Sequence, residues 1–137
     1  MTPWLIWSGR LPSDGDEAAT VNALVQTGMW RFHGEGKLDE IEDEARAIEL
    51  LTWLFGHRLA GHGLSELMPT ARASELAGRF VSLLPDRRRW FGNDWDGPPG
   101  PPEYISQSNP MTHATFDAGV VAVADRRAWI AWFTDED

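Results

Sequence analysis

The chain has 137 residues, no cysteine and a formal net charge of −9 at pH 7. This length predicts one domain, residues 1–137, with its own hydrophobic core, and the lack of cysteine excludes disulfides, thiolate metal sites and a cysteine nucleophile. The negative charge opposes binding to nucleic acids and to anionic membranes, and it favours a basic partner.

The lengths of the apolar runs in the chain indicate whether it could cross a membrane. They are far shorter than a membrane-spanning helix, and the N-terminus lacks the basic region and long apolar stretch of a signal peptide. We therefore expect a cytoplasmic protein without membrane contact. The eight tryptophans predict either a core rich in aromatic rings or an aromatic contact surface.

The first third of the chain predicts a strand, a helix and a second short strand. Residues 4–7 form an apolar run typical of a short buried strand, which Ser8, Gly9 and Pro12 close. A helix is expected from a cap at residue 13 or 14 to a glycine at residue 28. Residues 29–33 are compatible with a short strand.

The middle of the chain predicts two more helices. The first is expected to start near Lys37, and its apolar residues recur at steps of three and four. The second is expected to open at Thr70 or Ala71 and to stop before Pro85. The inward-facing residues are expected to be Leu38, Ile41, Ala45, Ile48, Thr52, Phe55 and Leu59 in the first helix, and Ala73, Leu76, Ala77, Phe80 and Leu84 in the second.

Residues 89–104, RWFGNDWDGPPGPPEY, combine large aromatics with four prolines and three glycines. We expect this segment to be a loop, because proline and glycine disfavour both helices and interior strands. After it, residues 119–124 and 128–133 flank a turn at residues 125–127 and predict a β-hairpin. Residues 112–117 could add a third strand beside the hairpin.

Together these elements predict an α+β fold. We expect an antiparallel sheet with a C-terminal hairpin or meander and three helices packed on one face. The strand at residues 4–7 is expected to join this sheet.

Known catalytic and cofactor motifs do not occur. There is no Gly-x-Ser-x-Gly elbow, no Walker loop and no Gly-x-Gly-x-x-Gly fingerprint, so we expect no cofactor. His57 and His62 are five residues apart, whereas a helical metal pair needs a spacing of four, and we expect no metal site. Three arginines precede Trp90, as in some nucleic-acid readers. We expect them instead to pair with the acids around them or to form the last turn of the preceding helical region, and we expect no nucleic-acid partner.

The aromatic loop has two interpretations. In the first, Trp90, Phe91 and Trp95 fold back over one end of the sheet and the prolines stiffen the loop. In the second, Trp95 stays partly exposed between Asp94 and Asp96, and together with Trp90 it captures a partner rich in arginine or lysine.

The last 23 residues, TFDAGVVAVADRRAWIAWFTDED, carry a resemblance to a known family. Phe116 and Asp117, a glycine at residue 119 before a β-run, a turn, Trp132 on the second strand and an acidic end resemble the C-terminal hairpin of small acidic bacterial immunity-type proteins. These proteins neutralise polymorphic toxins. The resemblance implies an α+β protein that binds a partner and catalyses nothing.

We therefore expect a non-catalytic, acidic protein-binding domain, in its most specific form an immunity protein that masks a basic toxin domain. Its partner-binding residues are expected to be Trp90, Asp94, Trp95 and Asp96. Two alternatives stay open. One is a small enzyme or ligand-binding domain with a pocket between sheet and helices, using His33, His113 and Glu35 as acid–base groups. The other is an assembly protein whose exposed aromatics form a homodimer face.

Overall fold

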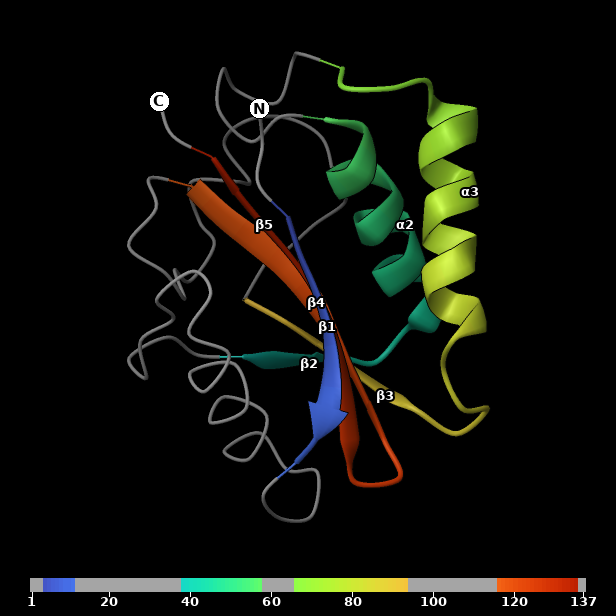
Figure 1. Cartoon of the computed structure of the whole chain (residues 1–137), viewed down its shortest axis with the longest axis vertical. Helices are drawn as coiled ribbons and strands as arrows, with labels where there is room; N and C mark the ends of the chain where they lie inside the picture. The colour runs from blue at the N-terminus through green and yellow to red at the C-terminus, as the bar shows by residue number, and fades with distance from the viewer. Residues whose placement is uncertain (1–3, 12–37, 58–65, 94–115, 136–137) are drawn as a thin grey trace.

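The computed structural model describes residues 4–11, 38–57, 66–93 and 116–135. These ranges build an α+β fold with helices on one side of a five-stranded antiparallel sheet (Figure 1). The strand order is β1-β5-β4-β3-β2. In chain order the elements are β1 (Trp4–Arg10), β2 (Asp39–Ile41), α2 (Glu44–Gly56), α3 (Thr70–Ser82), β3 (Arg89–Gly92), β4 (Phe116–Ala124) and β5 (Arg127–Asp135).

The predicted C-terminal hairpin is confirmed and lies at the centre of the sheet. Its turn is one residue shorter than expected, because Ala124 already pairs with Arg127. The two turn residues, Asp125 and Arg126, have φ angles of 51° and 63°. Positive φ at both positions is the mark of a type I′ turn, whose twist matches that of the two strands.

Both faces of the hairpin are buried. Val120 and Ala122 of β4 pack with the helices in one core cluster. Val121 and Val123, which point the opposite way, belong to a second cluster with Trp132. Burial on both sides explains why β4 is apolar throughout most of its length instead of alternating between apolar and polar residues.

Helix α2 begins later than the sequence suggests. Asp43 has an extended backbone, and its side chain accepts a hydrogen bond from the Ala45 amide at 3.0 Å, which caps a helix that starts at Glu44. The expected start near Lys37 is therefore wrong, since residues 39–41 form β2. The expected inward face is also wrong at Ala45, which is exposed. The buried face of α2 consists of Ala47, Leu50, Leu51, Leu54, Phe55 and Gly56.

Helix α3 is confirmed within its predicted bounds, with Ala73, Ala77 and Phe80 buried. Its small residues allow a close approach to α2, because a Cβ added at Gly56 would lie 3.4 Å from the Ala73 Cβ. The expectation of three helices is not supported. The described ranges hold two, and the helix and strand expected at residues 13–33 lie outside them.

Each of the two helices has 13 residues. Within the described part of the chain, none is long and apolar enough to cross a membrane. The cytoplasmic location stays a prediction.

Strand β1 joins the sheet as expected, but it is neither short nor fully buried. It continues through Ser8 and Gly9 to Arg10 and pairs with β5 along its whole length. It also forms one edge of the sheet, where 48% of Ile6 is exposed. The predicted closure at Ser8-Gly9 is wrong because β5 offers backbone partners to this part of the strand.

Strand β3 corrects the expected loop at residues 89–104. Its four residues form an interior strand between β4 and β2. Trp90 and Phe91 are each 2% exposed and enter opposite core clusters. These four residues contain no proline, so the prolines that follow do not prevent pairing. Residues 116 and 117 likewise begin β4 and belong to no separate strand.

The packing of Gly119 against Trp132 generates a stability prediction. A Cβ at Gly119 would collide with both the Ala131 carbonyl oxygen and the Trp132 ring. Gly119→Ala is therefore expected to lower the free energy of unfolding by about 1–3 kcal/mol. Gly78 in α3 is the matched control, because a Cβ there meets nothing within 4 Å. Gly78→Ala is expected to stabilise the fold by about 0.5–1 kcal/mol. Urea unfolding of both variants measures these changes, and equal effects would contradict the packing.

Candidate functional site

Within the described ranges, the edge strand β1 pairs with β5 on one side and with no strand on the other. The Leu11 amide donates to the Arg126 carbonyl at 2.8 Å, so odd-numbered residues of this segment turn their backbone groups toward β5. In an antiparallel pair these orientations alternate. The N–H and C=O groups of Ile6, Ser8 and Arg10 therefore point away from the sheet, and all three residues are exposed.

An apolar groove lies beside this edge, on the helix side of the sheet. It has a volume of about 260 Å³ and runs between β1 and the C-terminal end of α3. Two of its large apolar side chains face solvent, since Ile6 is 48% and Leu83 64% exposed. The groove is lined by Ile6, Trp7, Ser8, Phe80, Leu83 and Trp129. We call this surface the edge groove.

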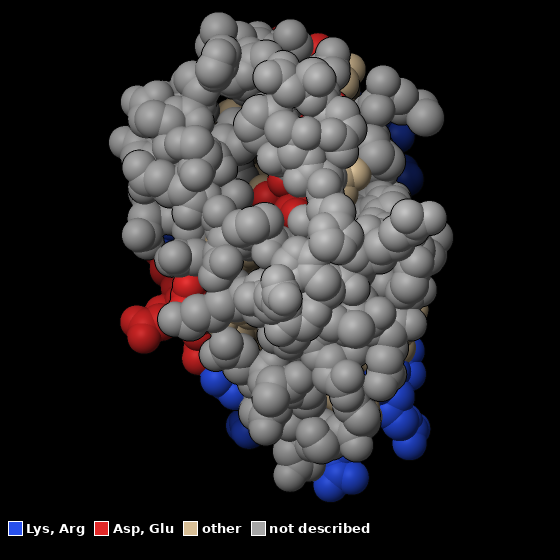
Figure 2. All heavy atoms as spheres, turned by 90° about the vertical axis from the view of Figure 1, so that its left-hand side faces the viewer, with Lys and Arg blue, Asp and Glu red and all other residues tan. Residues whose placement is uncertain are grey.

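Arginines gather at one end of the edge groove. Arg10 and Arg127 lie directly opposite each other on β1 and β5, and Arg126 occupies the adjacent turn. The Arg127 guanidinium carbon lies 5.9 Å from the centre of the Trp129 ring. Figure 2 shows arginine side chains at the lower end of the molecule, where the hairpin turn lies in Figure 1, and others near its upper right.

A second charged cluster joins α2 to β3. Glu44 accepts hydrogen bonds from Arg88 through both carboxylate oxygens, at 2.5 and 3.2 Å, and from the Trp90 indole nitrogen at 2.8 Å. The Arg88 and Trp90 hydrogen bonds lower the pKa of Glu44 below its ordinary value. The cluster holds the start of α2 against the interior strand β3.

The neighbouring arginine is engaged in the same way. Arg89 donates to both carboxylate oxygens of Glu40 at 2.8 and 3.2 Å, and this hydrogen bonding lowers the pKa of Glu40. The expectation that these arginines pair with nearby acids is confirmed for Arg88 and Arg89. Such pairing leaves their guanidinium groups less available to phosphate.

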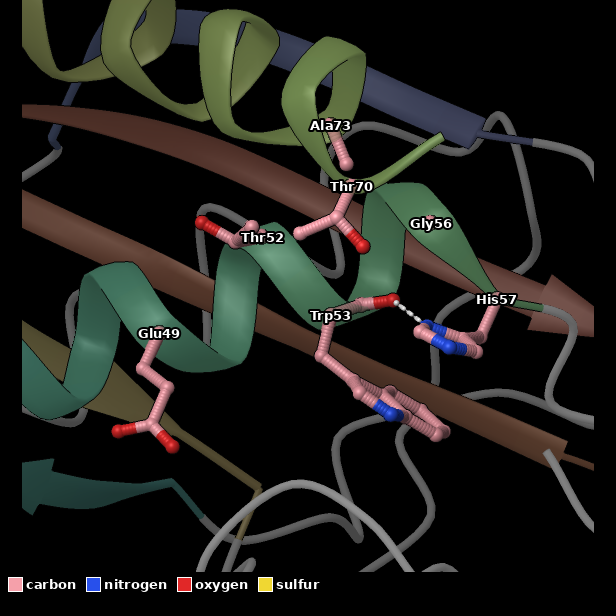
Figure 3. Close-up of a pocket in the computed structure, with 7 residues that line it drawn as sticks. All are labelled: Glu49, Thr52, Trp53, Gly56, His57, Thr70 and Ala73. Atoms are coloured by element: carbon pink, nitrogen blue, oxygen red, sulfur yellow. Dashed lines mark hydrogen bonds between the residues drawn. The ribbon is translucent and has the colours of Figure 1, made fainter. Parts of the chain in front are cut away.

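A pocket of about 410 Å³ opens between the C-terminal end of α2 and the start of α3 (Figure 3). His57 stacks on Trp53, with ring centroids 4.7 Å apart. Its Nδ1 lies 3.0 Å from the Trp53 carbonyl oxygen and must donate to it, which satisfies one carbonyl at the helix end. Thr70 and Ala73 line the opposite wall.

This pocket does not assemble an acid–base pair from its described lining. The carboxylate in that lining, Glu49, precedes His57 by eight residues, which is about 12 Å along a helix axis. A general base needs its partner within hydrogen-bond reach. Among the described residues, no group of three side chains is placed to hold a metal ion.

The predicted partner-binding residues are not brought together on a described surface. Trp90 is a core residue whose indole nitrogen is bonded to Glu44. Asp94, Trp95 and Asp96 lie outside the described residues. The acid–base candidates of the enzyme alternative, and the second histidine of the expected pair, also lie outside them: His33, Glu35, His62 and His113.

A buried contact marks where the aromatic segment leaves the sheet. Asn93 is fully buried, and its amide nitrogen donates to the Asp117 carbonyl oxygen at 3.0 Å and to its carboxylate at 3.1 Å. Asp117 is 2% exposed. This contact links the residue that follows β3 to the start of β4.

Sequence reasoning missed the edge groove. The local pattern places Ile6 in a buried strand, and Leu83 lies just beyond the correctly predicted helix α3. One signal was present, because Leu83 falls outside the set of α3 residues expected to face inward. The exposure of Ile6 depends on the strand order, which no local pattern reveals.

Comparisons with known proteins add no relative to this description. No family model, curated protein or solved structure matches the chain significantly. The resemblance of the C-terminal hairpin to immunity-type proteins therefore stays a prediction.

The Glu44 cluster generates a pH-dependent prediction. A carboxylate with a lowered pKa stabilises the fold above the ordinary carboxyl range of about 4.3, and this contribution is lost as the pH falls through the lowered value. Because Glu44 is 42% exposed, Glu44→Gln is expected to cost only about 1 kcal/mol at pH 7.

The difference from wild type should shrink between pH 7 and pH 3, because a falling pH favours protonation of the wild-type carboxylate and so weakens its hydrogen bonds with Arg88 and Trp90. Chemical unfolding at both pH values measures the effect. Glu42→Gln is the matched control, since it removes the same charge from an exposed position two residues away. An equal loss for both variants, or a loss that does not depend on pH, would contradict the role of the cluster.

Proposed function

We propose that the chain is a non-catalytic protein-binding domain that contacts its partner through the edge groove. The observation that carries this proposal is the exposure of Ile6 and Leu83 on either side of one groove. Exposed apolar side chains that cluster, rather than occur singly, are typical of contact surfaces. A tryptophan in the lining of the groove adds the residue type most enriched at the centres of interfaces.

The chemistry of the groove supports binding over catalysis. None of its described lining residues has an acidic, basic or thiol side chain. The surface therefore offers apolar contact and one hydroxyl, but no group that could transfer a proton near neutral pH. The α2–α3 pocket does contain an imidazole, but the carboxylate in its described lining, Glu49, lies about two helical turns from His57; Glu66, which forms a β-bridge with His57, is not part of that lining.

The more specific form, an immunity protein that masks a basic toxin domain, is supported by two observations. The net charge of −9 speeds the approach of a basic protein. Glu42 and Asp43 are exposed just before α2, and together with Asp94 and Asp96 they provide carboxylates that such a partner could meet. Asp94, Trp95 and Asp96 remain its proposed contacts.

Lysine substitutions in the groove test the proposed function. Ile6→Lys and Leu83→Lys place a charge on each wall of the edge groove and are expected to reduce capture of the partner at least tenfold, because a desolvated ammonium opposes apolar contact. Ser74→Lys is the matched control. It is exposed on α3, about 14 Å along the helix axis from Leu83.

The measurement is affinity capture from the cytosol of the source cell, followed by mass spectrometry. The same protein should be recovered by wild type and by Ser74→Lys and be lost with both groove variants. Circular dichroism checks that all variants are folded. Recovery of one partner by every variant, or of none by the wild type, would contradict the proposal.

A further inference from the structure

We infer that β1 accepts a sixth strand, an extended segment of another protein that is apolar opposite Ile6 and carries a carboxylate opposite Arg10. This inference rests on the proposed function and names the chemistry of the partner. It concerns a contact formed by backbone pairing, in which the partner lengthens the sheet at its open edge.

The edge has the features that strand addition requires. β1 pairs with β5 over seven consecutive residues without a bulge, so it is continuous over about 24 Å. Its sequence, WLIWSGR, contains no proline, no lysine and no acidic residue. Natural proteins use prolines and charged side chains to keep edge strands from pairing, and between residues 4 and 10 the one such residue is Arg10 at the end of the strand.

The side chains beside the edge define the apolar part of the partner. Ile6 and Ser8 point to the helix side of the sheet, because they pair with Ala131 and Trp129, which pack in the helix-side cluster. An added strand would place every second side chain on this face, next to Ile6 and within reach of the groove wall formed by Leu83. Apolar residues at these positions would bury the exposed surface of both side chains.

The arginines at the end of β1 and β5 indicate where the partner segment should carry a charge. Arg10 and Arg127 are directly opposite on neighbouring strands, an arrangement of like charges that destabilises a sheet. Within the described part of the chain Arg10 makes no ion pair, and Arg127 contacts the Trp129 ring. A carboxylate on the added strand opposite Arg10 would relieve this repulsion. Asp125 in the turn does not balance the charges of Arg10, Arg126 and Arg127, so this end of the edge keeps an excess of positive charge.

The net negative charge of the chain does not prevent this pairing. The acids of β2 belong to the opposite edge, four strand steps from β1. At about 4.8 Å per step, that distance is about 19 Å, more than twice the screening length of about 8 Å at physiological salt. Among the described residues, the charges nearest to this end of the edge are therefore those of Arg10, Arg126 and Arg127, with Asp125 in the turn.

A second copy of the chain fits the β1 edge less well than a segment of another protein does. In a two-fold antiparallel pairing centred on Trp7, Arg10 would lie opposite Trp4 of the other copy. β1 offers no carboxylate to either arginine, and two copies with a charge of −9 each repel one another.

Selection from a displayed library of random eight-residue peptides tests the inference. Peptides that bind the full chain are expected to alternate apolar and polar residues and to carry aspartate or glutamate near one end. For a synthetic copy of a selected peptide, Arg10→Glu should weaken binding roughly five- to tenfold, and changing the peptide's acidic residue to arginine should restore it. Arg87→Glu is the matched control, because Arg87 is exposed outside the edge groove.

Pairing through backbone hydrogen bonds can be tested separately from the side-chain contacts. N-methylation of peptide residues whose N–H faces β1 should weaken binding roughly tenfold, whereas methylation of the intervening residues should have little effect. Insensitivity to Arg10→Glu, or an equal effect of methylation at every position, would overturn the inference. So would enrichment of no peptide, or a wild-type dimer in analytical ultracentrifugation that Ile6→Lys dissociates.

The outcomes separate this inference from the proposed function. Binding that is lost with Ile6→Lys and Leu83→Lys, but indifferent to Arg10 and to the methylation pattern, would leave the edge groove as a contact surface and reject strand addition. Binding that ignores both groove variants would reject the proposed function as well.

Discussion

The structure depends on a hairpin that is buried on both faces. β4 and β5 share the longest pairing in the sheet, and every other strand is added to one side of this pair or the other. Gly119 allows the Trp132 ring to lie across β4, where any Cβ would collide with it. A sheet extends by backbone pairing at its edges, and the two edges of this sheet are β1 and β2.

The two edges of the sheet differ in length and charge, and they therefore differ in how readily another strand could pair with them. β2 has three residues, two of them acidic, and the cluster of Glu44 with Arg88 ties the adjoining helix to the sheet. β1 has seven residues and a single charge. A short acidic edge resists strand addition, whereas a long apolar edge invites it. The edge groove lies beside β1, the longer and less charged of the two edges.

The correct predictions were those that local signals decide. The hairpin follows from two apolar runs around a tight turn, and α3 follows from its periodicity and from Pro85. The errors at β2 and β3 have one cause: three- and four-residue strands form only because a neighbour pairs with them. Trp90 shows the consequence for the site, since an aromatic residue expected at a contact surface became a core residue once β3 paired with β4.

The amino-acid sequence alone determined the α+β class, the C-terminal hairpin and α3, because these depend on short-range patterning. The tertiary structure selected the acids that pair with Arg88 and Arg89, since Glu44 and Glu40 lie 44 and 49 residues away along the chain. Only the tertiary structure decided which strand became an edge. That choice placed Leu5 in the core and left Ile6 at the surface. The tertiary structure also placed Leu83 across the edge groove from Ile6 and Arg10 opposite Arg127, because helix packing and strand order bring together residues that are far apart in the sequence.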